Sequence, residues 1–401
     1  MIKVAKFGGT SLASADEFRL VAAILKDGDI KVTVASAGGK KGSNGKITDL
    51  LLSAYGRIVS GDDLTVALKD FYNRITELIY GLKVNSDIED LRKTIECGFK
   101  KEPTLDFLLS RGEYVYSLVL SEYLGKKFVD AAEIMKFDED GKFNLEISKF
   151  LIRRTYSENG EFITGGFYGS LPDGKIKVFE RGGSDYTGAV IAAALGAEYE
   201  NYTDVNGMYS FDPHIISSAR RIDEISFEQA RIMSEFGAGV IHPDSVLPLI
   251  GTDLPIHIKN TFEPLCGGTV LREKCEKEVF GCAIGQNFTY AKLIGINRGD
   301  KIFGELNDLN LVVSSVSKDG VIAIFKGDAD RIKNLRYADK FIVCPQVYLL
   351  YLTVGKHSEK VADKIKSEIY TRYFCLNDSG YFIAFDSENK PSVIEILKTN
   401  M

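Results

Sequence analysis

The segment that most constrains the fold is the first forty residues, where two strand-like runs enclose a helix. Residues 2–8 and 30–37 are rich in β-branched side chains and end in Gly, Ser or Ala, which predicts two strands. Between them, Ser14 and Glu17 have the spacing of a capping box, and apolar residues follow at helical intervals: Leu12, Ala15, Phe18, Ala22 and Leu25. A strand, a glycine turn, a helix and a second strand form the unit of a parallel sheet covered by helices.

This α/β pattern continues to about residue 265. Residues 48–123 carry apolar stripes at helical spacing and are expected to form a mostly helical insert. Helices are also predicted at 185–195 and at 226–236, where Ser226 and Gln229 repeat the capping-box spacing. Further strands are predicted at 127–130, 161–168, 175–179, 198–203 and 255–260. We therefore expect one large α/β domain over residues 1–265.

Residues 266–401 have a different sequence pattern from residues 1–265, because short runs of Val, Ile, Leu and Tyr alternate with turns. One helix is predicted at 358–369, where Val361, Ile365 and Ile369 share a face. The strand candidates are 292–296, 309–316, 321–326, 346–354, 372–376 and 380–385. This pattern indicates two compact α+β modules.

Composition excludes several classes of protein. A chain of 401 residues is long enough for two or three domains, and its net charge of −6 argues against a nucleic-acid surface. No apolar run approaches the roughly 18 residues of a membrane span, and Lys3, Lys6 and the Gly8-Gly9 pair interrupt any apolar leader. Six cysteines without a C-x-x-C pair, beside four histidines, do not suggest a metal site. We expect a cytoplasmic protein with reduced thiols.

The first glycine loop follows the first predicted strand. Gly8 and Gly9 leave the backbone N–H groups uncovered, the following helix start adds partial positive charge, and Lys6 adds a full charge, so the loop suits an anion. The simpler interpretation is a tight turn with a lysine at an exposed strand end. The later stretch GGKKGSNGKIT, residues 38–48, is not a phosphate loop of the Walker A type, because its glycines fall at the wrong offsets.

A second glycine loop occurs in FERGGSDYTGAVIAAALG, residues 179–196. Arg181 precedes its glycines, and Ser184 and Asp185 follow them. Arginine recognises carboxylates through two parallel hydrogen bonds, whereas Asp185 alone would be read as a stabiliser of the helix dipole. Two such loops, each with its own cation, suit a donor phosphate and an acceptor held in line.

The third stretch is YTDVNGMYSFDP, residues 202–213, where Tyr209 follows a turn. Its ring would pack either on a nucleobase or against the hydrophobic core.

Together these stretches resemble the aspartate kinases of the amino-acid kinase family. The resemblance covers about the first 265 residues and runs through seven ordered blocks: KFGGTS (6–11), VASAGG…ITDLL (34–51), SRGEYVYS (110–117), ITGGFYG (163–169), ERGGSDYT (180–187), TDVNGMYSFDP (203–213) and FGAGVIHP (236–243). It implies a three-layer αβα sandwich with a mainly parallel sheet, followed by α+β modules of the ACT type.

The family transfers the γ-phosphoryl group of ATP to the side-chain carboxylate of L-aspartate, and the 4-phospho-L-aspartate formed enters lysine, methionine and threonine synthesis. An aspartate carboxyl has a pKa of about 3.9, so the nucleophile is already ionised and requires no general base. Catalysis then consists of positioning two anions and neutralising the charge on the phosphoryl group. Mg²⁺ is implied as a cofactor, held mainly by ATP oxygens.

The resemblance also assigns roles to particular residues. Lys6 matches the phosphate-clamping lysine, and Asp185 matches an essential aspartate that organises the lysine and backbone donors. Arg181 matches the arginine that holds the substrate α-carboxylate, and Glu113, otherwise a solvated helix residue, matches the acceptor of its ammonium group. The resemblance implies four further substrate positions: Ser36, Thr48, Phe167 and Ser184. It places on the ATP side Lys6, Phe7, Gly8, Gly9, Thr203, Asp204, Tyr209 and Asp212.

Two positions depart from the family pattern. Gly239 stands where the family commonly has a lysine that reaches the nucleotide phosphates, and His214 stands where an arginine often follows Asp-Pro. A lysine of the basic loop (Lys40, Lys41 or Lys46) would substitute, or glycine would allow a closer approach of the backbone. The sequence leaves both explanations open.

In the family, the C-terminal modules bind an end-product amino acid and form a dimer interface. The resemblance therefore implies lysine or threonine as an effector and a homodimer or larger homo-oligomer, whereas a purely structural dimerisation domain is the alternative. Two other functions also stay open: a kinase for N-acetylglutamate or glutamate, and a non-catalytic amino-acid sensor. Intact Lys6, Arg181, Asp185 and Glu113 oppose the sensor.

Overall fold

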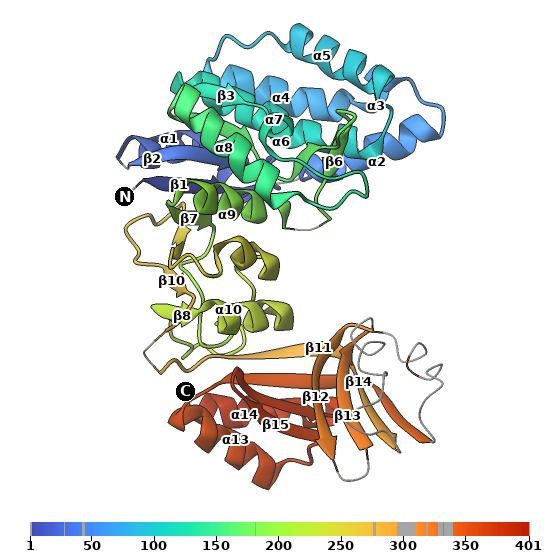
Figure 1. The fold of residues 1–401 in the computed structure, drawn as a ribbon, viewed down its shortest axis with the longest axis vertical. Helices are drawn as coiled ribbons and strands as arrows, with labels where there is room; N and C mark the ends of the chain where they lie inside the picture. Colours follow the sequence, from blue (N-terminus) through green and yellow to red (C-terminus); the bar gives the residue numbers. More distant parts are fainter. Residues whose placement is uncertain are drawn as a thin grey trace. The chain divides into compact units, whose positions relative to one another are not determined.

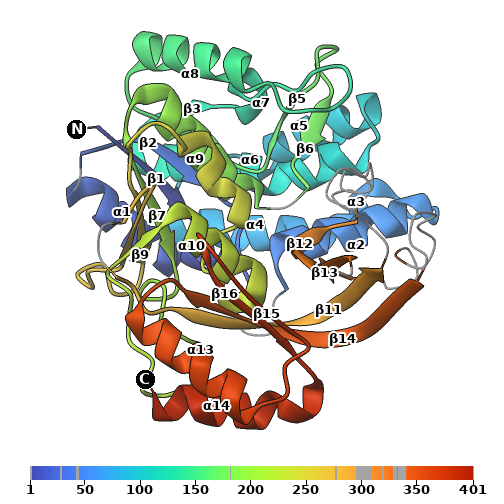
Figure 2. The ribbon, with the colours of Figure 1, turned by 60° about the horizontal axis from the view of Figure 1, so that its bottom comes forward.

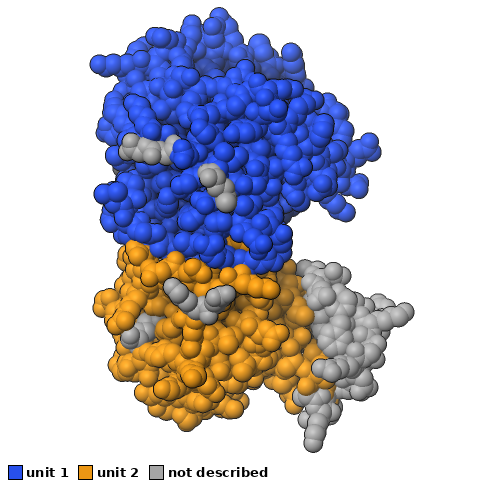
Figure 3. Space-filling view, turned by 60° about the vertical axis from the view of Figure 1, so that its left-hand side comes forward, with its two compact units in different colours: residues 1–207, 240–273 blue, residues 208–239, 274–401 orange. Residues whose placement is uncertain are grey.

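A computed structural model describes residues 2–27, 29–41, 45–180, 182–275, 278–294, 309–317, 320–327, 332 and 340–400. The chain forms two compact units (Figure 3). Unit 1 comprises residues 1–207 and 240–273, and unit 2 comprises residues 208–239 and 274–401. Among the described helices, none is both long and apolar enough to cross a membrane.

Unit 1 is organised around a sheet whose strands follow the order β3-β4-β2-β1-β7-β9-β10. All neighbours from β3 to β9 pair in parallel, and β10 pairs antiparallel with β9. The strands are β1 (Lys3–Phe7), β2 (Ile30–Ala35), β3 (Lys127–Val129), β4 (Phe162–Gly165), β7 (Glu198–Thr203), β9 (Ile256–Asn260) and β10 (Thr269–Arg272). The expected mainly parallel sheet is confirmed.

One predicted strand is broken in two. The sequence suggested a continuous strand over 161–168, but β4 ends at Gly165 and a separate hairpin pairs β5 (Tyr168–Ser170) with β6 (Ile176–Val178). The break falls at Phe167, whose φ of +74° is incompatible with an extended strand.

Helices cover both faces of this sheet, which makes unit 1 a three-layer αβα sandwich (Figure 1). Ala5 and Phe7 of β1 point into a core shared with helices α1, α4 and α6, whereas α9 packs on the strands from the other side. The helices are α1 (Ala15–Asp27), α2 (Ile47–Val59), α3 (Leu64–Ala67), α4 (Lys69–Leu82), α5 (Ile88–Lys101), α6 (Leu105–Leu124), α7 (Ala131–Ile134), α8 (Leu145–Asn159) and α9 (Gly183–Leu195).

Unit 2 contains a six-stranded antiparallel sheet in the order β12-β13-β11-β14-β16-β15. Its strands are β11 (Cys282–Ile294), β12 (Leu311–Ser317), β13 (Gly320–Lys326), β14 (Lys340–Thr353), β15 (Tyr373–Asn377) and β16 (Gly380–Phe385). Helices α13 (Lys356–Glu368) and α14 (Lys390–Thr399) lie side by side against this sheet (Figures 1 and 2). This arrangement is consistent with the expected ACT-like modules.

The segment 208–239 packs into the core of unit 2. It contains β8 (Glu224–Ser226), α10 (Phe227–Met233) and a π-helical turn, η2 (Ser234–Ala238). Phe211 and Ile216 are buried in one cluster with apolar residues of β14, β16, α13 and α14. The predicted capping box at the start of α10 is confirmed, because Ser226 Oγ accepts from the Gln229 N–H group and the Gln229 side chain accepts from the Ser226 N–H group.

Candidate active site

The two glycine loops meet through an ion pair within unit 1. Lys6 lies near the carboxyl end of β1, and Asp185 lies in the first turn of α9. The Lys6 Nζ atom is 2.6 Å from Asp185 Oδ1, and the two side chains are only 11% and 14% exposed. Such a largely buried charge pair at the ends of two elements is expensive to maintain and marks a candidate functional site.

Asp185 is held by two further donors. Asn201 Nδ2 donates to Oδ1 at 3.2 Å, and the backbone N–H of His242 donates to Oδ2 at 3.2 Å. Burial alone would raise the pKa of Asp185, but the Lys6 ammonium and these hydrogen bonds outweigh it and lower the pKa below its ordinary value. A carboxylate whose lone pairs are occupied in this way is suited to orienting Lys6 and is poorly placed to accept a proton.

The first glycine loop packs tightly against the loop that follows β2. The Gly9 carbonyl accepts hydrogen bonds from the N–H groups of Gly39 at 2.7 Å and Leu12 at 3.1 Å. A Cβ atom on Gly9 would lie 2.8 Å from the Ala37 carbonyl oxygen, closer than side chains tolerate. Gly9 is therefore required by the turn itself.

Gly8 has a different environment. Its N–H donates to the Tyr202 carbonyl at 3.1 Å, so this amide is already committed, although both loop amides were expected to face an anion. A Cβ atom on Gly8 would lie 3.6 Å from Lys6 Nζ, an ordinary contact. The absence of a side chain at Gly8 leaves the approach to the Lys6 ammonium open. The Phe7 side chain is fully buried and stacks on the ring of Tyr202, with centroids 4.7 Å apart.

Glu113 is a buried carboxylate without a full set of partners. It lies in α6, is 5% exposed, and its Oε2 atom has no hydrogen-bond partner among the described residues. Burial raises the pKa of Glu113 to about 7, while a hydrogen bond from the Ala37 backbone and the charge of Lys6 offset part of this effect, so Glu113 lies within electrostatic reach of Lys6. A buried carboxylate oxygen without a partner is costly unless a ligand supplies the missing donor.

The predicted substrate positions Phe167 and Ser184 belong to two loops in close contact. A Cβ atom on Gly166 would lie 2.6 Å from Ser184, and one on Gly183 would lie 2.8 Å from the Phe167 Cα atom. Phe167 is one of the few non-glycine residues with a positive φ, and its carbonyl accepts from the Phe179 N–H at 2.8 Å. Backbone strain of this kind is commonly retained at functional sites.

The other candidates are distributed over both units. The Ser36 N–H donates to the Phe7 carbonyl at 3.2 Å, which places it beside the end of β1, and Thr48 lies in the first turn of α2. Thr203 ends β7, and its hydroxyl contacts the Asp204 carboxylate at 3.3 Å. Arg181 lies outside the described residues.

Tyr209 and Asp212 belong to unit 2, whereas the Lys6 cluster belongs to unit 1. The backbone of Tyr209 forms a bridge with that of Arg221, and Asp212 Oδ1 accepts from the His214 N–H at 2.8 Å. Both residues lie on the loop that precedes β8.

The structure bears on the two departures from the family pattern. Lys41 pairs with Glu17 at 3.0 Å, whereas Lys40 and Lys46 are exposed and form no ion pair among the described residues. A Cβ atom on Gly239 would lie 3.2 Å from three atoms of Ser234, which is tighter than most real contacts. The second observation favours a close backbone approach as the reason for glycine at this position.

Asn201 and His242 are site residues that the sequence analysis did not single out. Asn201 is buried in β7 directly opposite Lys6 in the parallel register, and a polar residue at a buried strand position was a usable signal. His242 acts through its backbone N–H, and its ring occupies the space that a side chain on Gly182 would need. A backbone donor leaves no trace in residue type, although His242 lies within one of the recognised blocks.

Comparisons with known proteins identify the family of this chain. The profile of the amino acid kinase family matches residues 1–260. Lysine-sensitive aspartokinase 3 of Escherichia coli is 32% identical over 352 residues, which cover 80% of this chain and 77% of that enzyme. The crystal structure of Clostridium acetobutylicum aspartate kinase matches with a TM-score of 0.86 at 27% identity, covering 100% of both chains. The structure of E. coli aspartokinase III in complex with aspartate and ADP matches with a TM-score of 0.80 at 25% identity, also covering 100% of both chains. The chain belongs to the amino acid kinase family and, within it, to the aspartokinases.

Proposed function

We propose that the Lys6–Asp185 cluster is the phosphoryl-transfer centre of an aspartate kinase, in which ATP phosphorylates the side-chain carboxylate of L-aspartate to give 4-phospho-L-aspartate. The observation that carries this proposal is the 2.6 Å ion pair between the two glycine loops, with Gly8 leaving the approach to the ammonium open. The aspartate and ADP bound to the E. coli relative support the choice of substrates.

In this proposal Lys6 binds the transferring phosphoryl group and Asp185 orients Lys6. The nucleophilic carboxylate is ionised at neutral pH and needs no base. Asp185 is held ionised and hydrogen-bonded by Asn201 and His242, which suits an orienting role. A fixed ammonium in a site of low exposure stabilises the charge that spreads over the phosphoryl oxygens in the transition state.

The substrate side is proposed to consist of Glu113, Arg181, Ser36, Thr48, Phe167 and Ser184. Glu113 would accept the α-ammonium of aspartate, which supplies the donor that its Oε2 atom lacks. Arg181 would hold the α-carboxylate through a two-pronged contact, as the family resemblance implies. The α-ammonium and the α-carboxylate of aspartate are thus each matched by one group of opposite charge, which leaves the side-chain carboxylate to react.

The nucleotide side is proposed to involve Phe7, Gly8, Gly9, Thr203, Asp204, Tyr209 and Asp212. The described residues contain no cluster of three or more His, Cys, Asp or Glu side chains that would bind a metal ion by themselves. The buried Asp185 carboxylate is already engaged by Lys6. We therefore propose that Mg²⁺ is held mainly by ATP oxygens, where it would neutralise phosphate charge.

The remaining proposals concern organisation and regulation. Residues 1–265 would form the catalytic domain, and 266–401 a regulatory and dimerisation region of ACT-like modules. Lysine or threonine is the proposed effector, which the lysine-sensitive E. coli relative supports for lysine. The protein is proposed to act in the cytoplasm as a homodimer or larger homo-oligomer.

The test is ATP- and Mg²⁺-dependent formation of an acyl hydroxamate in hydroxylamine, with aspartate, glutamate and N-acetylglutamate assayed separately. We expect product from aspartate alone. Product from glutamate or N-acetylglutamate instead would identify another amino-acid kinase, and no product from a folded protein would favour a sensor. Adding lysine or threonine to the aspartate reaction then tests the C-terminal region.

A further inference from the structure

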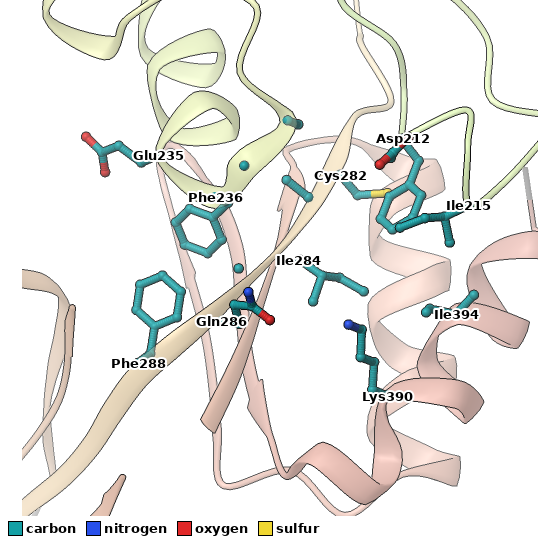
Figure 4. A pocket seen from close by; sticks show the side chains of 15 residues that line it. Asp212, Ile215, Glu235, Phe236, Cys282, Ile284, Gln286, Phe288, Lys390 and Ile394 are labelled. Carbon is teal, nitrogen blue, oxygen red and sulfur yellow. The ribbon is translucent and has the colours of Figure 1, made fainter. Parts of the chain in front are cut away.

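Buried polar atoms without partners are distributed differently in the two units. In unit 2, side chains converge on a cavity of about 360 Å³ (Figure 4), and none of its described lining residues carries such a side-chain atom. In unit 1, two of these atoms belong to residues of the candidate active site, Glu113 Oε2 and Asn201 Oδ1. The proposed function supplies a partner for Glu113 and leaves Asn201 Oδ1 without one.

Asn201 is a polar residue in the interior of the sheet. It is 2% exposed in β7, and its register neighbours are Lys6 on β1 and Ile258 on β9. Tyr199, two residues earlier on the same face of β7, donates its hydroxyl to the backbone carbonyl of Asp185. Strands inside a parallel sheet usually carry aliphatic residues at such positions, and burying an amide costs free energy unless its polar atoms are used.

The Asn201 amide shares one carboxylate oxygen with Lys6. Asp185 Oδ1 accepts a hydrogen bond from Asn201 Nδ2 at 3.2 Å and lies 2.6 Å from Lys6 Nζ. The other oxygen, Oδ2, accepts from the backbone N–H of His242. Because only the NH₂ group of an amide can donate to a carboxylate, these contacts fix the orientation of Asn201. The amide oxygen is therefore the atom that has no partner among the described residues.

Sharing this oxygen affects how firmly Asp185 holds the ammonium. If Lys6 were the only partner of Oδ1, this little-exposed carboxylate would compete with a phosphoryl group for the same cation. The hydrogen bond from Asn201 offsets part of the charge on Oδ1, and it still satisfies this oxygen when the ammonium turns toward a phosphate. Asn201 Oδ1, beside Lys6 in the register, offers the ammonium a second acceptor that carries no net charge.

We propose that Asn201 is a positioning residue whose NH₂ group holds Asp185 and whose carbonyl oxygen accepts from Lys6, so that the ammonium stays directed at the transferring phosphoryl group. This role rests on the proposed function, in which Lys6 binds that group. Because Asn201 acts through Lys6 and Asp185, its loss should lower kcat and leave the KM for aspartate nearly unchanged.

The first variant tests whether the polar atoms of Asn201 are needed for turnover. Asn201→Leu keeps the approximate size of the side chain and removes both its donor and its acceptor. In the hydroxamate assay we expect kcat to fall about tenfold or more, the usual effect of losing a hydrogen bond to a charged group. Asn144→Leu makes the same substitution at the N-cap of α8, where it should lower stability and leave kcat as in the wild type.

The second variant gives a pH dependence that a purely structural role would not give. In Asn201→Asp, the introduced carboxyl can donate to Asp185 when protonated, as the amide does. When ionised it cannot donate, it repels Asp185, and it holds Lys6 more strongly. Two carboxylates that share a site raise the pKa of one of them. We therefore expect kcat of this variant, divided by that of the wild type, to fall as the pH rises from 5 to 8, whereas the ratio for Asn201→Leu stays flat.

The other charged groups near position 201 are known among the described residues. Lys6 approaches from β1 and Asp185 from α9, and Glu113 on α6 lies within electrostatic reach of Lys6. The pKa of Glu113 is about 7, so it titrates in the same range in the wild type and in both variants. Saturating aspartate and the ratio to the wild type remove its contribution.

The proposal is overturned if Asn201→Leu keeps the wild-type kcat, if Asn144→Leu loses as much, or if the ratio for Asn201→Asp does not change with pH. Should Asn201→Leu fail to fold by circular dichroism, the pH dependence of Asn201→Asp decides alone. A wild type that forms no hydroxamate from aspartate overturns the proposed function and this role with it. An active wild type with equally active Asn201 variants overturns only the role of Asn201.

Discussion

Glu113 combines a cost to the stability of the fold with a proposed role in substrate binding, and the two can be measured separately. Burial raises the pKa of Glu113 from its ordinary value of 4.5 to about 7. The unfolded chain therefore releases the proton at a lower pH than the folded protein does. The contribution of Glu113 to the free energy of unfolding is fully present below about pH 4.5 and is lost as the pH rises through 7. The total loss is roughly 3 kcal/mol.

The variant Glu113→Gln keeps the shape of the side chain and removes this cost. From denaturant melts, we expect the stability of the variant relative to the wild type to rise by about 2–3 kcal/mol between pH 5 and pH 8. Glu122→Gln, at an exposed position of the same helix, is the control and should show no such trend. A difference between Glu113→Gln and the wild type that stays constant over this range would refute the reasoning.

The same substitution should impair the binding of aspartate. Glu113→Gln removes the proposed acceptor of the α-ammonium, so the KM for aspartate should rise at pH 8 by about tenfold or more, with little change in the KM for ATP. In the wild type the KM for aspartate should rise as the pH falls below 7, because Glu113 becomes neutral. A variant that is more stable at high pH and also binds aspartate normally would show that Glu113 is costly to bury but does not bind the substrate.

Three further predictions concern the glycines and the arginine. Gly8→Ala should fold normally and lose activity, because its methyl group would lie 3.6 Å from Lys6 Nζ. Gly9→Ala should lose about 1–3 kcal/mol of stability, because its methyl group would collide with the Ala37 carbonyl. Denaturation and kinetic measurements that show the reverse pattern would contradict this packing. Arg181→Ala should raise the KM for aspartate far more than the KM for ATP, and equal effects would remove it from the carboxylate. Gly239→Lys should lower the melting temperature by several degrees, because its Cβ would crowd the neighbouring turn; an unchanged melting temperature would refute the close-approach explanation.

Much of the fold follows from local patterns in the sequence. The alternation and glycine endings of residues 2–8 and 30–37 predicted β1 and β2, and these strands pair in parallel as expected. The helical insert corresponds to α2 through α6, because apolar stripes at helical spacing and a low content of strand-forming runs leave little ambiguity. The capping box of Ser226 and Gln229 is also a local signal, since all its partners lie within one turn.

Features that depend on distant contacts were not predictable in this way. β11 was expected only at 292–296, but it runs from Cys282 to Ile294, because the Gly285–Asn287 bulge resembles a turn in sequence and is held in the sheet by β14. Helix α14, with a proline in its first turn, was not identified. The packing of Phe211 in the core of unit 2 depends on residues of β14 and α13, far along the chain.

The same difference between local patterns and distant contacts holds for the residues of the candidate site. Lys6 and Asp185 stand in glycine loops that are visible in the sequence, but their 2.6 Å contact is created by the fold. Only the family resemblance singled out Glu113, since its burial in α6 depends on packing against other elements. The Gly8 amide was expected to face an anion, and its hydrogen bond to Tyr202 became visible only with the strand pairing in place.

The proposed role of Lys6 in neutralising the charge on the transferring phosphoryl group is tested by single-turnover formation of aspartyl hydroxamate by the wild type and by Lys6→Ala. We expect the rate to fall by at least about 100-fold in the variant, with the fold and aspartate binding retained, because the ammonium acts mainly on the transition state. A variant that folds and turns over at the wild-type rate would show that the Lys6–Asp185 cluster does not take part in the chemistry.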